Sequence, residues 1–524
     1  MTVRPSPLVT HSPNKPFPLI ETIGGRALSR PLTLPPDVET APVEPTEAER
    51  APQKPRVPHI LFAGLLAGGL LLRVVTQLGF RPAFWFNDSF EYLGIALRWD
   101  AYLIRPNGYS AYLWLLRPSH SIAAVTVSQH LMGLGIAVAG YVLLLRHGVR
   151  RWLAALAAVP VLFNPYQIQL EHLVMSDTLF LGLVVAALVV LLWHRKPGPR
   201  TVAVVGLLIA AASLTRSLGP ALVGLVGIYL LARRTGWRGL VALAVAAVVP
   251  LAGYAAWFKS EHGSFAMSSS EGIYLYSRVI PFADCAKIEP PQRLRPLCES
   301  RPVGKRWEVG SGYIWWDGPL DRIPLSRKAS VEVPEDRFDP ARNEAAREFA
   351  MLALRAQPGD YLRVVAKDVA RGFAWERDVY PSPYVYNMYE FSERPHNPPA
   401  GRVFVSGATW EQDMRAYAHG DARTQVVRPA AGWMMWYQKH ATFPGPVLAV
   451  LFVVALAGIA VRRARDDRRL TAGLLVAVGA ALLVLPSLTA QFDHRYVLVA
   501  IPFAAWSAAL GLSMLAGRAS PPRS

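Results

Sequence analysis

The chain has 524 residues, 52% of them hydrophobic, and carries 55 Lys and Arg against 37 Asp and Glu, for a formal net charge of +18. Such a basic balance is typical of nucleic-acid binding, but here the cations lie between long apolar runs, which argues against a nucleic-acid partner. The runs are about 15 to 25 residues long, close to the roughly 20 that a helix needs to cross a bilayer. The composition therefore predicts an α-helical polytopic membrane protein.

Residues 1–58 contain 13 prolines and no apolar run, which predicts a disordered cytoplasmic tail and no cleavable signal peptide. Ten spans are then predicted, at 59–79, 121–145, 151–164, 175–193, 201–215, 219–232, 239–257, 445–461, 470–487 and 496–516. They divide the chain into spans one to seven within 59–258, an extracytoplasmic domain at 259–443, spans eight to ten within 444–516, and a cytoplasmic tail at 517–524.

Lys and Arg in short loops set the orientation of a membrane protein. With the N-terminus inside, the cytoplasmic loops 146–151, 194–200, 233–238 and 462–469 hold 14 Lys and Arg, and the outer connections 164–177, 214–219 and 487–496 hold two. Both termini are then cytoplasmic. The bias towards Arg, Ala, Gly and Pro suggests a bacterial gene, and hence a bacterial cell (inner or plasma) membrane.

The extracytoplasmic domain contains the only two cysteines, Cys285 and Cys298. A disulfide between them is expected in an oxidising compartment, with two unpaired thiols as the alternative. A pair of helices is predicted at 341–357 and 360–375, separated by Pro358 and Gly359. The aromatic segment 380–391 would either stack on sugars or pack at the lipid interface.

The first outer loop, 80–120, begins with "FWFNDSFEYL" at 84–93. The run 89–103 has apolar residues at helical spacing and predicts an interfacial helix on the outer leaflet. Asp88 lies at its start, where partial burial would raise the carboxyl pKa and suit a general base. Alternatively, Asp88 or a neighbour caps the helix, with Glu91 completing a capping box.

Further charged residues lie at the same side of the membrane. Glu171 and Asp177 precede the fourth span, where acids serve substrates or protons; alternatively, Asp177 caps the helix. Arg216, in "LTRSLGP", would hold a phosphate or snorkel to the interface. Arg495, in "QFDHRY", would bind a lipid phosphate or pair with Asp493. Weaker cationic candidates stand before the eighth span, at Lys439 and His440.

Several motifs are missing from the sequence. It has no P-loop, no GxGxxG after a strand, no HExxH and no CxxC. The chain is therefore not expected to use ATP or to bind a dinucleotide. Energy for any synthesis would come from an activated substrate.

The order and sidedness of these motifs resemble those of the GT-C glycosyltransferases, especially the lipid-carrier-dependent enzymes similar to protein O-mannosyltransferases and aminoarabinose transferases. The resemblance covers roughly 59–257 and 445–516, and "RAQPGDYLRVVAKD" at 355–368 is similar to a segment of bacterial members. It implies a polyprenyl-phosphate-linked sugar as donor and a glycan, lipid or protein of the cell envelope as acceptor.

The resemblance also implies roles for residues. Asp88 matches the aspartate that acts as the base on the acceptor, and Arg216 and Arg495 match the cations that neutralise the carrier phosphate. "RPNGYSAYL" at 105–113 is similar to the family's segment at the end of the first loop. Substrate contacts are accordingly expected from the neighbours of these residues: Glu91, Tyr92, Arg105, Tyr109 and Tyr496.

Two features depart from the family pattern. Ser89 stands where a second acid commonly follows the aspartate, so a divalent cation is optional. "IRPNG" replaces the usual His-x-Pro-Pro segment on the acceptor side.

Three other functions stay open. A transporter or flippase for lipid-linked sugars would favour internal repeats around a midplane site. A repeat-unit polymerase or ligase would rely on arginine-rich outer loops. A non-catalytic partner in envelope assembly would tolerate a degenerate acidic motif.

Overall fold

The computed structural model describes residues 59–316, 318–326, 333–421, 423–461 and 466–517. All the elements named here lie within Pro58–Ser524. The tails expected at 1–58 and beyond residue 517 lie outside the described residues.

Helices occupy all ten ranges predicted to span. Six are long and apolar enough to cross a bilayer: α1 (Ile60–Gly79), α4 (Ile122–Arg146), α8 (Ser176–Trp193), α11 (Trp237–His262), α21 (Asp466–Thr489) and α22 (His494–Leu515). Two further candidates are bent pairs of helical segments. In the first, α5 (Arg151–Leu156) and α6 (Val159–Phe163) meet α7 (Pro165–His172) at 54°. In the second, α19 (Ala430–His440) meets α20 (Gly445–Ala460) at 59°.

The remaining two predicted spans, α9 (Pro199–Thr215) and α10 (Gly219–Ala232), are apolar but short. At 1.5 Å per residue, the 14 residues of α10 reach about 21 Å, less than the hydrocarbon thickness of roughly 30 Å. The described chain is thus a mostly helical, multi-pass membrane protein with six to eight candidate spans. The break at 216–218 separates α9 from α10 where the sequence predicts it.

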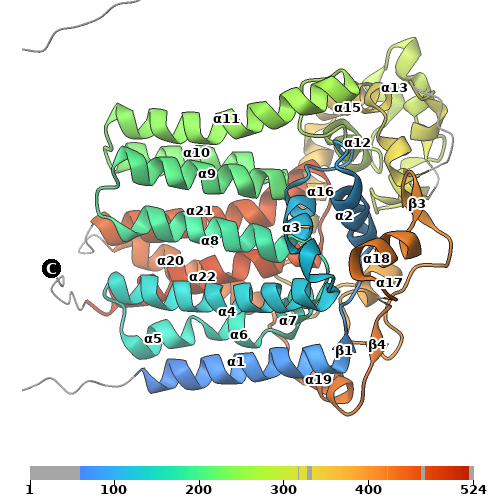
Figure 1. The fold of residues 1–524 in the computed structure, drawn as a ribbon. Coiled ribbons are helices and arrows are strands. Elements are labelled where there is room, and N and C mark those ends of the chain that lie inside the picture. The colour runs from blue at the N-terminus through green and yellow to red at the C-terminus, as the bar shows by residue number, and fades with distance from the viewer. Residues whose placement is uncertain (1–58, 317, 327–332, 422, 462–465, 518–524) are drawn as a thin grey trace, which may run out of the picture. The chain divides into compact units, whose positions relative to one another are not determined.

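Helix α22 is the centre of the bundle, since 89% of its apolar stretch is buried, against 22% for α1 and for α11. It packs on α20, α21 and α4, while α8 lies between α4 and α9, and α11 covers α9. The spans run side by side, and the first loop and residues 263–429 gather at one end (Figure 1). That end, which the charge pattern predicts to face outside, is called the outer end.

The regular elements of the segment between α11 and α19 are mainly helices, and its strands take part in two small antiparallel sheets. Its helices are α12 (Glu271–Val279), α13 (Cys285–Ile288), α14 (Gly312–Trp315), α15 (Pro340–Ala356), α16 (Pro358–Arg371), α17 (Pro383–Asn387) and α18 (Trp410–Ala418). Strand β2 (Val403–Val405) pairs with β3 (Ala408–Thr409), and β1 (Phe80–Arg81), directly after α1, pairs with β4 (Gln425–Val426). Helices α15 and α16 form the predicted helical pair, and a disulfide joins Cys285 to Cys298.

The first outer loop contains α2 (Asn87–Arg98) and α3 (Gly108–Leu116). The prediction of a helix resting on lipid is wrong for α2, because Ser89–Ala96 are all buried in protein. Helices α3 and α18 and strand β2 pack on it. Arg98, the last residue of α2, donates two hydrogen bonds of 2.7 Å to Asp413 of α18.

A buried ion pair joins the first span to α7. Arg73 donates from Nε to Glu171 Oε2 at 2.7 Å and from Nη2 to Oε1 at 2.8 Å, and both side chains are almost fully buried. His130 lies 3.1 Å from the same carboxylate. A Cβ added to Gly133 of α4 would come within 2.0 Å of Glu171 Oε1, so the carboxylate is packed tightly against that helix.

Replacing Arg73 with Met should leave the Glu171 charge buried without its main partner and destabilise the fold by about 3–5 kcal/mol. The double variant Arg73→Met/Glu171→Gln holds no buried charge at this position and should recover part of that loss. Unfolding by a denaturing detergent measures both. A double variant no more stable than Arg73→Met would show that charge burial is not the cause.

Candidate active site

Four stretches far apart in the sequence bring charged side chains together at the outer end. Asp88 and Glu91 lie on α2, and Arg105 lies in the loop before α3. Asp177 stands in the first turn of α8, Arg216 between α9 and α10, and Asp493 and Arg495 at the start of α22. These seven residues, linked by ion pairs, are called the outer cluster.

Arg105 bridges the two carboxylates of α2. Its Nη1 lies 3.0 Å from Asp88 Oδ2, its Nη2 lies 3.0 Å from Glu91 Oε2, and its guanidinium stands 5.0 Å from the centre of the Tyr92 ring. Asn107 fixes this loop, since its Nδ2 donates to the Asp100 carbonyl at 2.7 Å. This hydrogen bond stabilises the loop that carries Arg105, and so helps to hold its guanidinium between the two carboxylates.

Arg495 connects this pair to the rest of the cluster. Its Nη1 lies 3.6 Å from Asp88 Oδ2 and 3.7 Å from Asp177 Oδ2, and its Nε lies 3.3 Å from Asp493 Oδ2. Arg216 donates from Nη1 to Asp177 Oδ1. The Tyr496 ring centre lies 5.6 Å from the guanidinium carbons of Arg216 and Arg495. Two arginines therefore flank Asp177, and one of them also touches Asp88.

A glycine contact brings the first loop onto the α9–α10 turn. A Cβ on Gly108 would lie 2.5 Å from the carbonyl oxygen of Leu214, a backbone atom that has no freedom to move aside. This close approach places the segment carrying Arg105 directly against the segment carrying Arg216. Glycine at this position fits because it has no side chain to hold the two backbones apart.

The contacts decide between several of the alternatives raised by the sequence. The cap of α2 comes from Ser89, whose Oγ accepts the Phe86 N–H at 2.9 Å, so Asp88 and Glu91 are free of that task. Asp177 makes no capping bond to α8. Asp493 does cap α22, because its Oδ1 accepts the Arg495 N–H at 3.2 Å. The Arg216 side chain is only 13% exposed and turns into the protein rather than towards the interface.

Other predicted site residues lie apart from the outer cluster. Glu171 is fully buried in its pair with Arg73. Lys439 and His440 are exposed at the end of α19. Tyr109 is buried and donates to Gln129 at 2.8 Å, and its ring packs edge-on against Tyr92 with centroids 4.8 Å apart. Tyr109 thus contacts the outer cluster indirectly, through the Tyr92 ring that packs against Arg105.

Two tyrosines near the cluster were not foreseen. Tyr274 of α12 lies within electrostatic reach of Arg105, Asp88 and Glu91. Tyr389, in the aromatic segment, is buried beside Asp493 and Arg495. The aromatic richness of 380–391 was a signal for Tyr389, whereas nothing in the sequence around Tyr274 marked it.

The two carboxyls of α2 ionise differently. Burial raises the pKa of Glu91 to about 7, opposed by Arg105 and reinforced by the negative charge of Asp88. Burial also acts on Asp88, but Arg105 and Arg495 outweigh it and hold the pKa of Asp88 below its ordinary value, so the expectation of a raised pKa at Asp88 is wrong. At neutral pH Asp88 is therefore charged, while Glu91 holds its proton more tightly than an ordinary carboxyl.

The donor set does not fit a divalent cation. Arg105 occupies the position between Asp88 and Glu91 that a metal bridging two carboxylates would take. Within the described ranges, no three His, Cys, Asp or Glu side chains are grouped as metal ligands. We therefore derive no step through a metal.

No protein-family model and no curated protein matches the chain. Among solved structures, it is similar to the protein O-mannosyltransferase Pmt1–Pmt2 complex of S. cerevisiae (14% identity, TM-score 0.31, covering 42% of this chain and 36% of that chain). It is also similar to ArnT of Cupriavidus metallidurans (18% identity, TM-score 0.32, covering 86% of this chain and 77% of that chain). A third similar structure is the oligosaccharyltransferase of Archaeoglobus fulgidus (14% identity, TM-score 0.39, covering 88% of this chain and 50% of that chain).

The chain thus spans about a third to a half of the length of two of these proteins. ArnT has also been solved bound to undecaprenyl phosphate, and the archaeal enzyme AglB with a dolichol-phosphate and an inhibitory peptide. The identity to each of these three solved structures is 18% or lower.

The raised pKa of Glu91 makes a prediction about stability. The folded protein holds this proton more tightly than the unfolded chain, so the stability from protonated Glu91 is complete below about pH 4.5 and is lost as the pH rises through about 7. The melting temperature of Glu91→Gln, measured relative to that of wild type, should therefore increase as the pH rises from 5 to 8.

Glu308→Gln is the matched control. Hydrogen bonding to Lys367 lowers the pKa of this exposed carboxyl, so its replacement should give no such gain. Equal pH responses of the two variants would contradict the environment described for Glu91.

Proposed function

We propose that the protein is an inverting glycosyltransferase that moves a sugar from a polyprenyl-phosphate carrier to an acceptor hydroxyl of the cell envelope at the outer face of the membrane. One observation carries this proposal: Arg495 touches both Asp88 and Asp177, and Asp177 also holds Arg216. Two cations suited to binding a phosphate, Arg216 and Arg495, thereby lie close to the charged carboxylate of Asp88 at the outer end. The donor class is what the resemblance of the sequence motifs to the lipid-carrier-dependent glycosyltransferases implies.

The carrier phosphate would bind between Arg216 and Arg495. In the free protein the two guanidinium groups are held by Asp177 and Asp493, which keep them oriented. An arriving phosphate offers several acceptor oxygens in the geometry that a guanidinium prefers. The polyprenyl chain would remain in the bilayer.

The transfer step would use Asp88 as the base. The acceptor oxygen attacks the anomeric carbon from the side opposite the phosphate, and its proton passes to Asp88. The bond between the anomeric carbon and the phosphate oxygen breaks, with its electron pair left on the phosphate. The low pKa of Asp88 keeps it charged at neutral pH, so it receives the proton as the attack makes the hydroxyl acidic. Arg216 and Arg495 stabilise the phosphate that leaves.

The acceptor would approach from the aromatic segment. Tyr384 is 50% exposed and its hydroxyl donates to Asn87 Oδ1 at 3.1 Å, one residue from Asp88. A sugar or phenol ring stacked there would bring a hydroxyl towards the base. Residues 263–429, which cover α2, would then choose the acceptor.

Asp88→Asn should lower kcat by about 10²–10⁴-fold, because the amide accepts no proton, while the KM for the donor changes little. The assay reconstitutes the protein in liposomes with radiolabelled polyprenyl-phosphate sugars. Asp378→Asn, a partly exposed acid of the outer end, is the control and should keep full activity. Undiminished transfer by Asp88→Asn would sink the role of Asp88, and no transfer by wild type with any sugar would favour a transporter or an assembly partner.

Arg216→Gln and Arg495→Gln should each raise the KM for the donor by roughly 10- to 100-fold, as expected for a lost charged hydrogen bond. Lys439→Gln removes an exposed cation outside the outer cluster and should leave this KM unchanged. If all three variants raise the KM equally, a diffuse positive surface rather than the outer cluster attracts the donor.

A further inference from the structure

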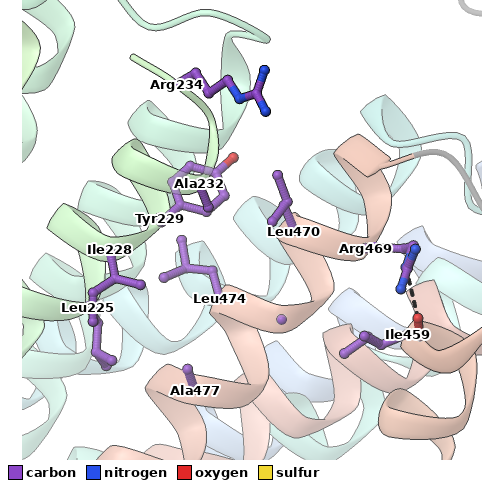
Figure 2. Close-up of a pocket in the computed structure, with 11 residues that line it drawn as sticks. Leu225, Ile228, Tyr229, Ala232, Arg234, Ile459, Arg469, Leu470, Leu474 and Ala477 are labelled. Carbon is purple, nitrogen blue, oxygen red and sulfur yellow. Dashed lines mark hydrogen bonds between the residues drawn. The ribbon is translucent and has the colours of Figure 1, made fainter. Parts of the chain in front are cut away.

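A cavity of about 710 Å³ lies between α10, α20 and α21. It is at the opposite end of the bundle from the outer cluster, because α10 starts three residues after Arg216 and reaches the cavity with its last turns. Figure 2 shows apolar side chains of α10 on one side, including Leu225 and Ile228, and Leu470 and Leu474 of α21 on the other.

Two arginines line the cavity beside its apolar walls, Arg234 in the loop after α10 and Arg469 near the start of α21. Arg469 donates from Nε to the Ile459 carbonyl at 2.9 Å, as Figure 2 shows. The neighbouring acid, Asp467, accepts a hydrogen bond of 2.5 Å from Arg233. The lining therefore combines apolar surface with positive charge.

The short helix α10 sets the depth of this cavity. Its 14 residues reach about 21 Å, short of the roughly 30 Å of hydrocarbon. A short span is accommodated by local thinning of the bilayer, which would bring lipid headgroups close to the last turn of α10. Ile228 is 65% exposed, so the apolar wall opens sideways towards lipid. A phospholipid could enter this space from the bilayer without passing through water.

We infer that this cavity binds one anionic phospholipid of the leaflet opposite the outer cluster, with an acyl chain between α10 and α21 and the phosphate beside Arg234 and Arg469. Basic pockets between spanning helices recognise anionic headgroups in this way. A second copy of this face is a poorer occupant, because a two-fold contact would bring the same arginines together. The site does not depend on the proposed transfer reaction.

Native mass spectrometry of the full-length protein tests the site with two probes, phosphatidylglycerol and zwitterionic phosphatidylethanolamine. Wild type should retain phosphatidylglycerol more tightly. Arg234→Gln should weaken that binding about fivefold. Arg238→Gln, at the start of α11 and outside the cavity, should leave it unchanged.

Gly473→Leu separates binding from folding. Gly473 lines the cavity, and a Cβ there meets nothing within 4 Å, so the leucine side chain fills the space that the acyl chain would take. Leucine also favours the helix over glycine, so the fold should persist while phosphatidylglycerol binding is lost. Gly253→Leu, at another open glycine on α11, is the matched control.

Three results would overturn the inference. Equal retention of the two lipids by wild type would remove the role of charge. An unchanged preference in Gly473→Leu would place the lipid elsewhere. A dimer that Gly473→Leu dissociates would assign the cavity to a second copy of the chain.

Discussion

Charge pairing across four separate segments is the interaction on which the outer end depends. Asp88, Asp177 and Arg495 are largely withdrawn from water, with side-chain exposures of 20%, 1% and 14%. Isolated charges in such surroundings cost several kcal/mol each, whereas paired ones cost far less. The first loop, the α9–α10 turn and the starts of α8 and α22 are therefore tied together by the need of each charge for a partner.

Under the proposed function, the same pairing prepares the site for an anion. Acids hold both arginines in place at the outer end, beside the starts of α8 and α22. A phosphate that replaces an acid exchanges one ionic partner for another, so little charge has to be desolvated anew. The buried pair of Arg73 and Glu171 shows the contrasting use of the same chemistry, since it is sealed from solvent and holds helices together.

The sequence predicted the helices and several members of the cluster, because their signals are local. Apolar runs mark spans, and Asp88, Arg216 and Arg495 each follow or interrupt such a run. Asp177 and Arg105 were also foreseen, but not that Arg105 bridges Asp88 to Glu91, which depends on the fold of the loop around Asn107.

Long-range packing explains the errors. Helix α2 has the pattern of an interfacial helix, yet residues 403–418, some 300 positions later, cover it. Glu171 carries the same acidic signal as Asp177, but its partner Arg73 lies within the first span, and no local pattern links these two residues. Tyr274 reaches the cluster only because α12 folds back over the first loop.

The most direct test is a structure determined in lipid nanodiscs with a polyprenyl phosphate. The proposed function predicts the phosphate within hydrogen-bonding distance of Arg216 and Arg495, with at least one of their contacts to Asp177 broken and Asp88 still beside Arg105. A phosphate bound elsewhere, with Arg495 still in contact with both Asp88 and Asp177, would contradict it.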